Sequence, residues 1–218
     1  MILEVKDLHV HYGRIGHLAN LSFAVDAGEI LCIRCPVLQF GTVLLWALIG
    51  AGERIEGRIR FDGENLAGPL FPTKLLALRE HIAMVYRERG LISLLTVEEN
   101  IALPLGYHYN VDRRKLADAV HDVADALRIS TLLDRDAEDI REMDTRLVNL
   151  ARALIRRPRL ILIDGLLEGM PGEREFIFET IKTYQEKDGF AVIMTARHSG
   201  IEHATRAFDL TEDGLKPV

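Results

Sequence analysis

The stretch from Val148 to Met170, VNLARALIRRPRLILIDGLLEGM, decides the fold of this chain. Its first part, LARALIRR, has good helix propensity, and its apolar residues recur at the three-and-four spacing of one buried helix face. We expect Pro158 to end that helix. The following LILID is an apolar run closed by one carboxylate, which is typical of a strand covered on both faces of a parallel sheet. Asp164 is therefore predicted at the carboxyl end of a central strand, where open α/β sheets bind ligands and where an acid commonly holds Mg²⁺.

The composition describes a globular chain with room for a full core and one subdomain. The chain has 218 residues, of which 48% are hydrophobic and 28% are charged. Its net charge of -6 provides no general attraction to nucleic acid or anionic lipid, so we expect no nucleic-acid partner. No apolar run approaches the length of a membrane span, and no signal peptide precedes MILEVKDL. We therefore expect a cytoplasmic protein.

Two sets of metal-ligating residue types have a simpler structural interpretation. Cys32 and Cys35 form a C-x-x-C, a spacing that also occurs in redox and metal sites. Cys32 falls inside the apolar run EILCI and the chain has no second cysteine pair, so we expect no functional pairing. His9 and His11 share one face of an alternating strand, and we interpret them as surface histidines.

The segment LARALIRRPRLILID resembles the helix and Walker B strand of an ATP-binding cassette, the nucleotide-binding subunit of ABC transporters. The resemblance extends over essentially the whole chain, from EVKDLHVHYG to an EDG near the end. It implies an α/β fold of the P-loop NTPase type, with a mainly parallel core sheet, an antiparallel β subdomain and a helical subdomain. A single domain over 1–218 is expected, with the Q-loop region and helical subdomain inserted over 88–145.

Alternation and turn signals place several elements within this frame. Ile2 to Val10 alternates as a half-buried strand, and LSFAVDAGEILCI adds two strands joined by a turn at Asp26-Ala27-Gly28. GRIRFDG, from Gly57 to Gly63, predicts a strand and turn. DRRKLADAVHDVADALRI predicts an amphipathic helix, and FAVIMTARH predicts the last core strand.

The segment LTVEENIALPL resembles the LTVxENVALPL of cassettes from bacterial lipid and lipoprotein transport systems. Thr96 is expected to cap the helix that VEEN begins, with Glu98 and Glu99 in its first turn complementing the helix dipole. In the family this region borders the groove that receives the coupling helix of a transmembrane partner. Capping and core packing explain the segment equally well, and the sequence does not separate the two.

The resemblance implies a phosphate-binding loop from Cys35 to Thr42, CPVLQFGT, before an apolar helix VLLWALIG. In the family pattern G-x-x-G-x-G-K-[ST], glycines turn successive N–H groups toward the phosphates and the lysine neutralises them. Other residues occupy the glycine positions and the lysine position, namely Cys35, Leu38, Phe40 and, for the lysine, Gly41. The Thr42 hydroxyl, a magnesium ligand in the family, is retained. Since positive φ would cost about 1–2 kcal/mol at each large residue, we expect a packed apolar connection without a ligand.

The family's hydrolytic positions are also altered. Arg87 stands in place of the Q-loop glutamine, and it cannot ligate a cation because a guanidinium group has no acceptor. Gly165 stands in place of the glutamate that acts as general base, a group worth ~10²–10⁴ in rate. We do not expect Glu168, one helical turn further on, to replace it, because a base must lie within hydrogen-bond reach of its proton. Arg197 stands at the switch-histidine position.

Three further family positions complete the comparison. IREMD, from Ile140 to Asp144, replaces the LSGGQ signature, which offers helix N-terminal amides to the γ-phosphate held by the opposite subunit. A carboxylate facing a triphosphate is repulsive, so the chain is also predicted to be a poor lid for a partner's ATP. Pro171 replaces the D-loop aspartate. Tyr12 keeps the aromatic ring that stacks on adenine in the family, and packing at a strand end explains it equally well.

Three functional hypotheses follow. The first is a non-catalytic cassette-like subunit, structural or regulatory, that needs no cofactor. It docks on a transmembrane permease at the inner face of the cell membrane. It forms either a homodimer or a heterodimer with a competent cassette. The second is a residual ATPase that uses ATP and Mg²⁺ with Tyr12, Thr42 and Asp164, assisted by Arg87 or Arg197. The third is a soluble regulator that binds another ligand at the old cleft, or none. Loss of the phosphate loop and the base argues against the second, and the intact LTVEENIALPL favours the first over the third.

Overall fold

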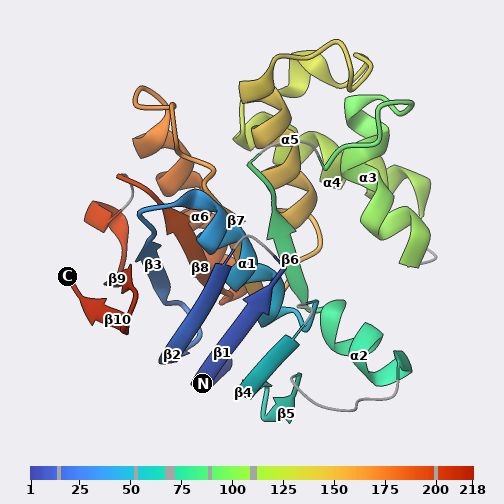
Figure 1. Cartoon of the computed structure of the whole chain (residues 1–218). Coiled ribbons are helices and arrows are strands. Elements are labelled where there is room, and N and C mark those ends of the chain that lie inside the picture. Colours follow the sequence, from blue (N-terminus) through green and yellow to red (C-terminus); the bar gives the residue numbers. More distant parts are fainter. Residues whose placement is uncertain (14–15, 52–53, 67–71, 88–89, 109–111, 199–200) are drawn as a thin grey trace.

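The computed structural model describes residues 1–13, 16–51, 54–66, 72–87, 90–108, 112–198 and 201–218. Two sheets and a group of helices make up the fold, as Figure 1 shows. A six-stranded sheet has the strand order β10-β9-β3-β8-β7-β6, and a four-stranded sheet has the order β2-β1-β4-β5. The expected α/β architecture, with a mainly parallel core sheet and an antiparallel β subdomain, is confirmed.

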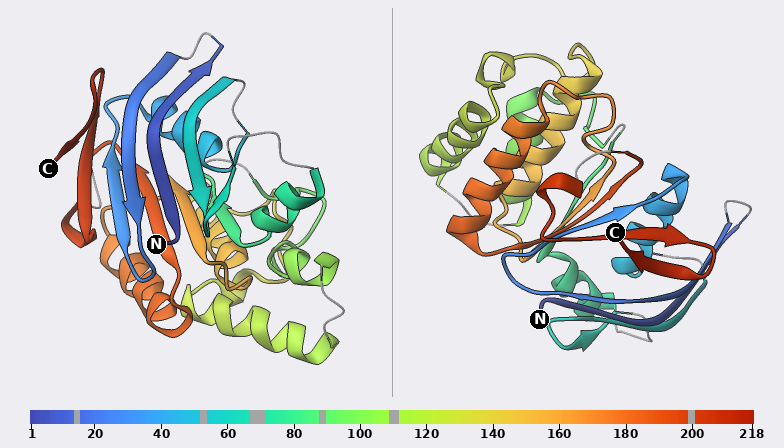
Figure 2. Two further views of the ribbon diagram at one scale, coloured as in Figure 1. Left: turned by 90° about the horizontal axis from the view of Figure 1, so that it is seen from below. Right: turned by 90° about the vertical axis from the view of Figure 1, so that its left-hand side faces the viewer.

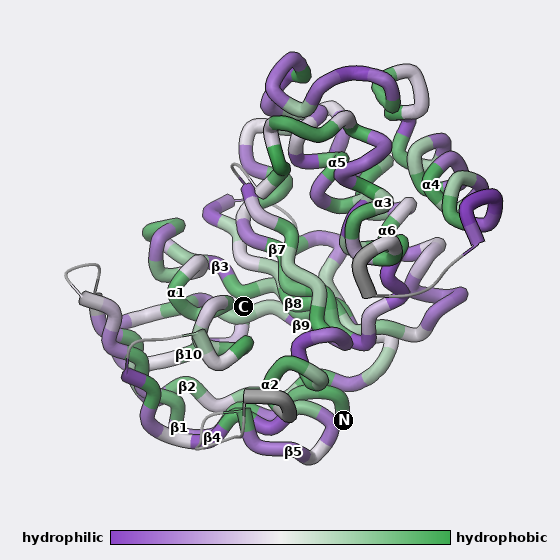
Figure 3. Tube along the Cα trace, turned by 90° about the vertical axis from the view of Figure 1, so that its right-hand side faces the viewer, coloured by the Kyte–Doolittle hydropathy of each residue, from purple (hydrophilic) through white to green (hydrophobic). Residues whose placement is uncertain are grey.

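The core sheet is parallel from β6 to β9, and its central strands β7 and β8 are buried at every position. This burial explains the apolar run LILID, because both faces of such a strand are covered. In Figure 3 both strands run through the interior, mostly as hydrophobic segments. The strands are β3 (Ile30–Arg34), β6 (Ile82–Val85), β7 (Leu160–Asp164), β8 (Ala191–Ala196), β9 (Arg206–Thr211) and, antiparallel to β9, β10 (Gly214–Pro217).

The antiparallel sheet shares one hydrophobic cluster with α1 (Leu38–Leu48) and one face of the core sheet. Figure 2 shows it as a layer beside the core sheet. β1 and β4 approach closely at Gly57, which has φ +99°, and a Cβ atom there would lie 2.2 Å from the Asp7 carbonyl oxygen. This approach therefore requires glycine. The strands are β1 (Leu3–Tyr12), β2 (Gly16–Val25), β4 (Arg54–Phe61) and β5 (Glu64–Asn65).

The helices α3, α4 and α5 form a group at one end of the core sheet (Figure 1) and share a second hydrophobic cluster with it. Thr96 caps α3 as predicted, since its Oγ1 accepts the Glu99 N–H at 3.2 Å and Glu99 Oε2 accepts the Thr96 N–H at 2.9 Å. Among the described helices, none is long and apolar enough to cross a bilayer. The helices are α2 (Pro72–Arg79), α3 (Val97–His108), α4 (Arg113–Ala126), α5 (Glu142–Leu154) and α6 (Arg174–Asp188), with 3₁₀ turns at Ser130–Leu132 and Ile201–His203.

The helices α3 and α4 lie between β6 and β7 in the chain, within the region 88–145 where we expect the helical subdomain. The predicted amphipathic helix is α4. Val120, Val123 and Leu127 are buried as expected, and Leu116 packs partly buried against the same cluster. The status of this region as an inserted subdomain of a single domain stays a prediction.

Three predicted boundaries are wrong. α5 ends at Leu154, four residues before Pro158, because the chain leaves the helix early and Arg157 adopts φ +48°. α1 begins at Leu38 rather than after Thr42, because residues with side chains at the former glycine positions continue into an ordinary helix. β8 is not the last core strand, since β9 pairs in parallel with β3 and is followed by β10. The partly polar pattern of β9 suits its place near the sheet edge.

The two cysteines belong to different hydrophobic clusters on the two sides of the core sheet. Cys32 packs in the cluster that contains the helical group, whereas Cys35 packs in the cluster of α1 and the antiparallel sheet. Neither thiol is in a disulfide in the structure. Burial raises the pKa of each thiol to about 12.

We predict that neither thiol reacts with Ellman's reagent in the native protein at pH 8. The thiolate is the reactive species, and a pKa near 12 leaves about one thiol in ten thousand ionised at that pH. In denaturant both thiols should react at once. Rapid reaction of either thiol in the native protein would contradict the burial of Cys32 and Cys35.

Candidate functional site

Asp164 lies at the carboxyl end of β7, as predicted, and both of its carboxylate oxygens accept hydrogen bonds. Thr42 Oγ1 donates to Oδ2 at 2.7 Å, and Thr195 Oγ1 donates to Oδ1 at 3.3 Å. Thr195 stands opposite Asp164 in the register of β7 and β8, so strand pairing positions it. The structure thus brings together the two residues predicted as magnesium ligands, Thr42 and Asp164, and joins them directly to each other.

The segment predicted as a phosphate loop forms the start of α1. Val37 precedes the helix in an extended conformation, and none of residues 35–42 has positive φ. Cys35 is buried and Phe40 packs partly buried on the same hydrophobic cluster. At Gly41, the lysine position, a Cβ atom would lie 2.8 Å from Thr195 Cβ. A lysine at Gly41 would therefore require α1 to move away from β8.

The general-base position is covered by two side chains. Gly165 adopts φ +56°, and a Cβ atom there would lie 3.3 Å from Arg87 Cδ and 3.7 Å from Leu38 Cδ2. Arg87 enters from the end of β6, and Leu38 enters from the first turn of α1. Two residues at altered family positions in the sequence, Arg87 and Leu38, consequently both lie close to a third, Gly165.

Glu168 holds the backbone that follows β8. Its Oε1 accepts the Arg197 N–H at 2.6 Å and the His198 N–H at 3.3 Å. Arg197, at the predicted switch position, is thus connected through its main chain to the segment after β7. This contact gives Glu168 a positioning role, and the expectation that it does not replace the general base stays a prediction.

A buried arginine from α5 fixes the segment after β7 from the other side. Arg146 donates from Nη1 to the carbonyl oxygens of Leu166, at 3.3 Å, and Glu168, at 2.5 Å. Its Nη2 donates to Glu142 Oε1 at 2.5 Å. Charge-assisted hydrogen bonds of this kind are among the stronger ones in proteins. Arg146 therefore ties the helical group to the site edge.

The N-terminus of α5, at the predicted signature position, carries its own carboxylates. Glu142 and Asp144 lie in the first turn, where negative charge complements the helix dipole. Arg141 occupies the N-cap position, and its Nε donates to Asp144 Oδ2 at 3.0 Å. The negative charge that a phosphate would bring to this helix end is already present in the chain.

The aromatic residue at the predicted adenine position contacts α1. The rings of Tyr12 and Trp46 lie 5.3 Å apart at 54°. Nearby on the sheet, His17 stacks on His11 at 4.2 Å and on His9 at 6.0 Å. The part of the chain that the structure describes has no group of three or more His, Cys, Asp or Glu that could hold a metal ion. The adenine-stacking role of Tyr12 stays a prediction beside packing at a strand end. His11 is exposed, as expected, and His9 is partly buried.

A family model described as ABC transporter matches residues 18–167. This chain belongs to the ABC transporter family. The matched range contains the segment expected as the phosphate loop, the segment expected as the signature, and β7.

Curated relatives and solved structures agree with this assignment. The branched-chain amino acid transport ATP-binding protein BraG of Pseudomonas aeruginosa is 28% identical over 212 residues, which cover 96% of this chain and 88% of BraG. The spermidine/putrescine import ATP-binding protein PotA of Chromobacterium violaceum is 27% identical over 200 residues. The match covers 91% of this chain but 54% of PotA. The dimeric ABC transporter cassette MJ0796 shares the fold with a TM-score of 0.87 at 20% identity, covering 99% of this chain and 97% of that one.

The structure adds two residues of the site that the sequence analysis does not name. Thr195 becomes visible through the pairing of β8 with β7, and Arg146 through the packing of α5 on the segment after β7. A signal for Thr195 existed in the sequence, since parallel strands end at one edge and a hydroxyl there can meet Asp164. For Arg146 the signal was weaker. An arginine on an otherwise buried helix face indicates that it has a polar partner, but the sequence does not identify that partner.

We predict that Gly165→Glu, which restores the family's acidic residue, destabilises the protein more than Gly169→Glu. Both glycines have left-handed φ, at +56° and +76°, so each substitution should cost about 1–2 kcal/mol. At Gly165 the new side chain also crowds Arg87 and reaches contact with Leu38, which should add about 1 kcal/mol, whereas a Cβ at Gly169 meets nothing within 4 Å.

Denaturant unfolding of the two variants and the wild type measures the difference. Equal destabilisation would show that Arg87 and Leu38 do not cover Gly165. Magnesium-dependent ATP hydrolysis by Gly165→Glu would contradict the same packing, because the new carboxylate would then have reached a working position.

Proposed function

We propose that this chain is a non-catalytic ABC-type subunit, a structural or regulatory component that docks on a membrane permease at the inner face of the cell membrane. The observation that carries the proposal is the cover of Arg87 and Leu38 over Gly165. A general base and attacking water need that space, and here the chain's own side chains lie beside it. No catalytic step is assigned to the site.

The site residues do not suit the triphosphate of ATP. The mismatch does not lie with Thr42 and Asp164, since a hydroxyl that donates to a carboxylate, here at 2.7 Å, can still ligate a cation. The lysine position is Gly41, which has no room for a side chain against Thr195. A triphosphate at this edge would therefore lack both the wrapped amides and the cation that the family uses. This supports the absence of a required cofactor.

A firmly held apolar loop supports docking of a partner. The buried Asn100 side chain donates from Nδ2 to the carbonyl oxygens of Ile92, Leu95 and Thr96, and its Oδ1 accepts the Ile92 N–H at 2.8 Å. The loop presents Leu94 at 90% exposure and Ile92 at 43%. Exposed large apolar residues beside a hollow mark protein interaction sites.

The hollow beside this loop has a volume of about 500 Å³ and lies between Leu91 and the start of α5. Its lining combines apolar residues with polar ones, namely Leu91, Ala137 and Ile140 with Ser93, Glu138, Glu142 and Thr145. An apolar anchor in such a hollow, with a polar rim, is a usual arrangement at protein interfaces. In the family this face receives the coupling helix of the permease, and we infer the same partner here.

The finer assignments belong to the same proposal. The LTVEENIALPL segment favours a system for lipid or lipoprotein transport. A subunit that does not hydrolyse ATP is consistent with either a homodimer or a heterodimer with a competent cassette. A residual ATPase that uses Tyr12, Thr42 and Asp164 is the alternative from the enzyme class. A regulator with this fold and no permease is the alternative that the exposed Leu94 disfavours.

We predict that millimolar ATP with Mg²⁺ leaves the melting temperature of the purified chain unchanged. A ligand that binds the native state alone must stabilise it, by about 2.7 kcal/mol at a hundred times its Kd. A competent ABC cassette measured in parallel should show the rise. A magnesium-dependent rise in this chain would favour the residual ATPase.

We also predict that Leu94→Asp abolishes co-purification with a membrane permease, because it places a charge in the apolar contact. Leu76→Asp is the matched control, since Leu76 is 60% exposed on α2, away from this loop. Tagged variants are purified from detergent-solubilised membranes, and bound proteins are identified by mass spectrometry. Equal permease recovery with both variants would rule out docking at Leu94, and recovery of no permease with the wild type would favour the regulator.

A further inference from the structure

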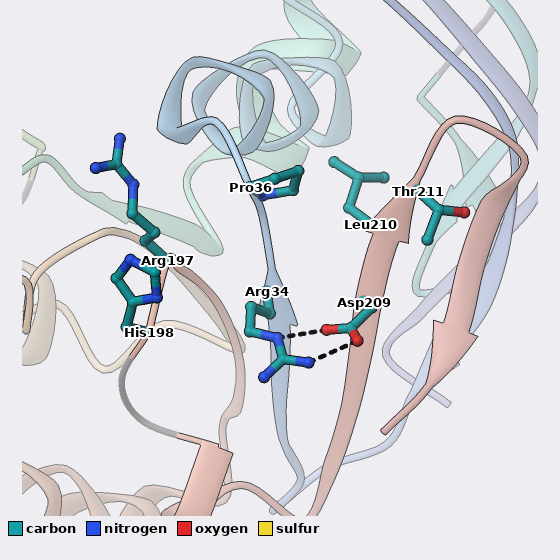
Figure 4. A pocket seen from close by; sticks show the side chains of 7 residues that line it. All are labelled: Arg34, Pro36, Arg197, His198, Asp209, Leu210 and Thr211. Carbon is teal, nitrogen blue, oxygen red and sulfur yellow. Dashed lines mark hydrogen bonds and ion pairs between the residues drawn. The ribbon is translucent and has the colours of Figure 1, made fainter.

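The cavity at the carboxyl ends of β3 and β9 contains an ion pair of the chain's own residues. Arg34 Nε donates to Asp209 Oδ1 at 2.5 Å, and Arg34 Nη2 donates to Asp209 Oδ2 at 2.6 Å, as the dashed lines in Figure 4 show. The Arg197 guanidinium group points away from this pair (Figure 4). Since the two paired charges neutralise each other, the pair offers no unbalanced charge to a ligand.

A second cavity, of about 480 Å³, follows one side of α6. Its lining includes Gly28, Ile30 and Thr205, so one end of it lies at the amino ends of β3 and β9. The site around Asp164 is separate, because it lies at the opposite edge of the sheet. The α6 residues of the lining share one face of the helix, because they recur three and four positions apart. They are Glu175, Phe178, Glu179, Lys182 and Gln185.

The 3₁₀ turn Ile201–His203 forms the wall opposite α6, and His203 connects the two walls. The His203 ring stacks on the Phe178 ring with 4.3 Å between centroids, and its Nε2 lies 3.3 Å from Glu175 Oε2. Figure 2 shows this turn, in red, beside α6, in orange. The position of one wall relative to the other is therefore set by contacts within the chain.

The lining has a net negative charge. The carboxylates of Glu175, Glu179 and Glu202 outnumber the single ammonium group of Lys182, whether or not the lining histidine is protonated. Arg174 approaches one carboxylate from outside the lining, with Nη1 4.0 Å from Glu202 Oε1. An exposed ion pair at that distance contributes little. The charge of the lining therefore favours a cation.

A buried amide adds a neutral acceptor to this lining. The Gln185 residue is 6% exposed, and its Nε2 donates to the carbonyl oxygens of Phe190 at 2.9 Å and Glu29 at 3.3 Å. These two acceptors determine which end of the amide is nitrogen, because an amide oxygen cannot donate to them. Oε1 accepts no hydrogen bond from a described residue. It is thus the polar atom that Gln185 leaves for a donor in the cavity, and a buried acceptor without a partner costs free energy.

We propose that this cavity binds a small organic cation with a primary ammonium group. Such a group has three N–H donors, which suit a set of carboxylate oxygens and the Gln185 Oε1. Among the described residues, no group of three or more His, Cys, Asp or Glu could hold a metal ion, so the acidic side chains are arranged for a longer cation rather than a bare one. Ile30, Phe178 and Ala204 supply apolar surface for its carbon chain.

The test is an NMR titration of the ¹⁵N-labelled full chain with n-butylammonium chloride. Tetramethylammonium chloride at the same ionic strength is the matched salt, because it carries the same charge without an N–H donor. We expect saturable shifts of the Gln185 side-chain amide and the Gly28 backbone amide with n-butylammonium. Binding of tetramethylammonium should be at least about tenfold weaker, the usual effect of losing hydrogen bonds to charged groups.

Two substitutions test the lining itself. Glu179→Gln should weaken n-butylammonium binding about fivefold, because it removes one carboxylate from the lining. Glu186→Gln is the matched control, since Glu186 is exposed on the same helix outside the lining and the change in charge is the same. Gln185→Met keeps a similar side-chain volume without the acceptor and should weaken binding about tenfold, as read from Gly28. Circular dichroism and melting temperatures verify folding, and the Glu179→Gln and Glu186→Gln pair decides the matter if Gln185→Met does not fold.

Four outcomes would overturn the proposal. These are no saturable shift at the lining residues with n-butylammonium, equal affinity for tetramethylammonium, equal weakening by Glu179→Gln and Glu186→Gln, and undiminished binding in a folded Gln185→Met variant. None of these outcomes depends on whether the chain hydrolyses ATP or docks on a permease.

Discussion

The requirement that β7 be covered on both faces constrains the rest of the structure. β6 and β8 flank it, and the helical group and the α1 layer fill the two clusters on either side. A strand with no exposed position needs apolar neighbours in every direction, which fixes where the sheets and helices can lie. Its final residue, Asp164, is the point at which the apolar strand ends and polar chemistry begins.

At that point the chain satisfies its own polar groups. Thr42 and Thr195 donate to Asp164, Glu168 accepts from the main chain after β8, and Arg146 donates to the carbonyl oxygens after β7. These internal contacts give partners to polar groups at the edge of the sheet. Under the proposed function, this edge serves as part of a scaffold.

The sequence predicted features that depend on neighbouring residues. The strand LILID and the Thr96 cap both follow from local patterns, and the structure confirms both. The early start of α1 at Leu38 was missed, because the family pattern implied a loop where ordinary side chains favour a helix. β9 was missed because it is partly polar and because its position depends on pairing with β3, which lies more than 170 residues away in the chain.

The features of the site also divide into those that the sequence predicts and those that appear only in the folded structure. That Gly165 lacks a carboxylate could be read from the sequence, but the cover of Arg87 and Leu38 over it depends on three segments that meet only after folding. The pairing of Arg34 with Asp209 was likewise invisible, because neither residue belongs to a motif and the contact joins two ends of the chain.

The hydrogen bonds from Asn100 have a kinetic consequence. A loop that is ordered before it meets its partner has no folding step to complete in the encounter, so association at Leu94 should proceed at the rate of an ordinary rigid-body collision. In the proposed complex with a permease, the dissociation rate would then depend on how well the partner accommodates Leu94.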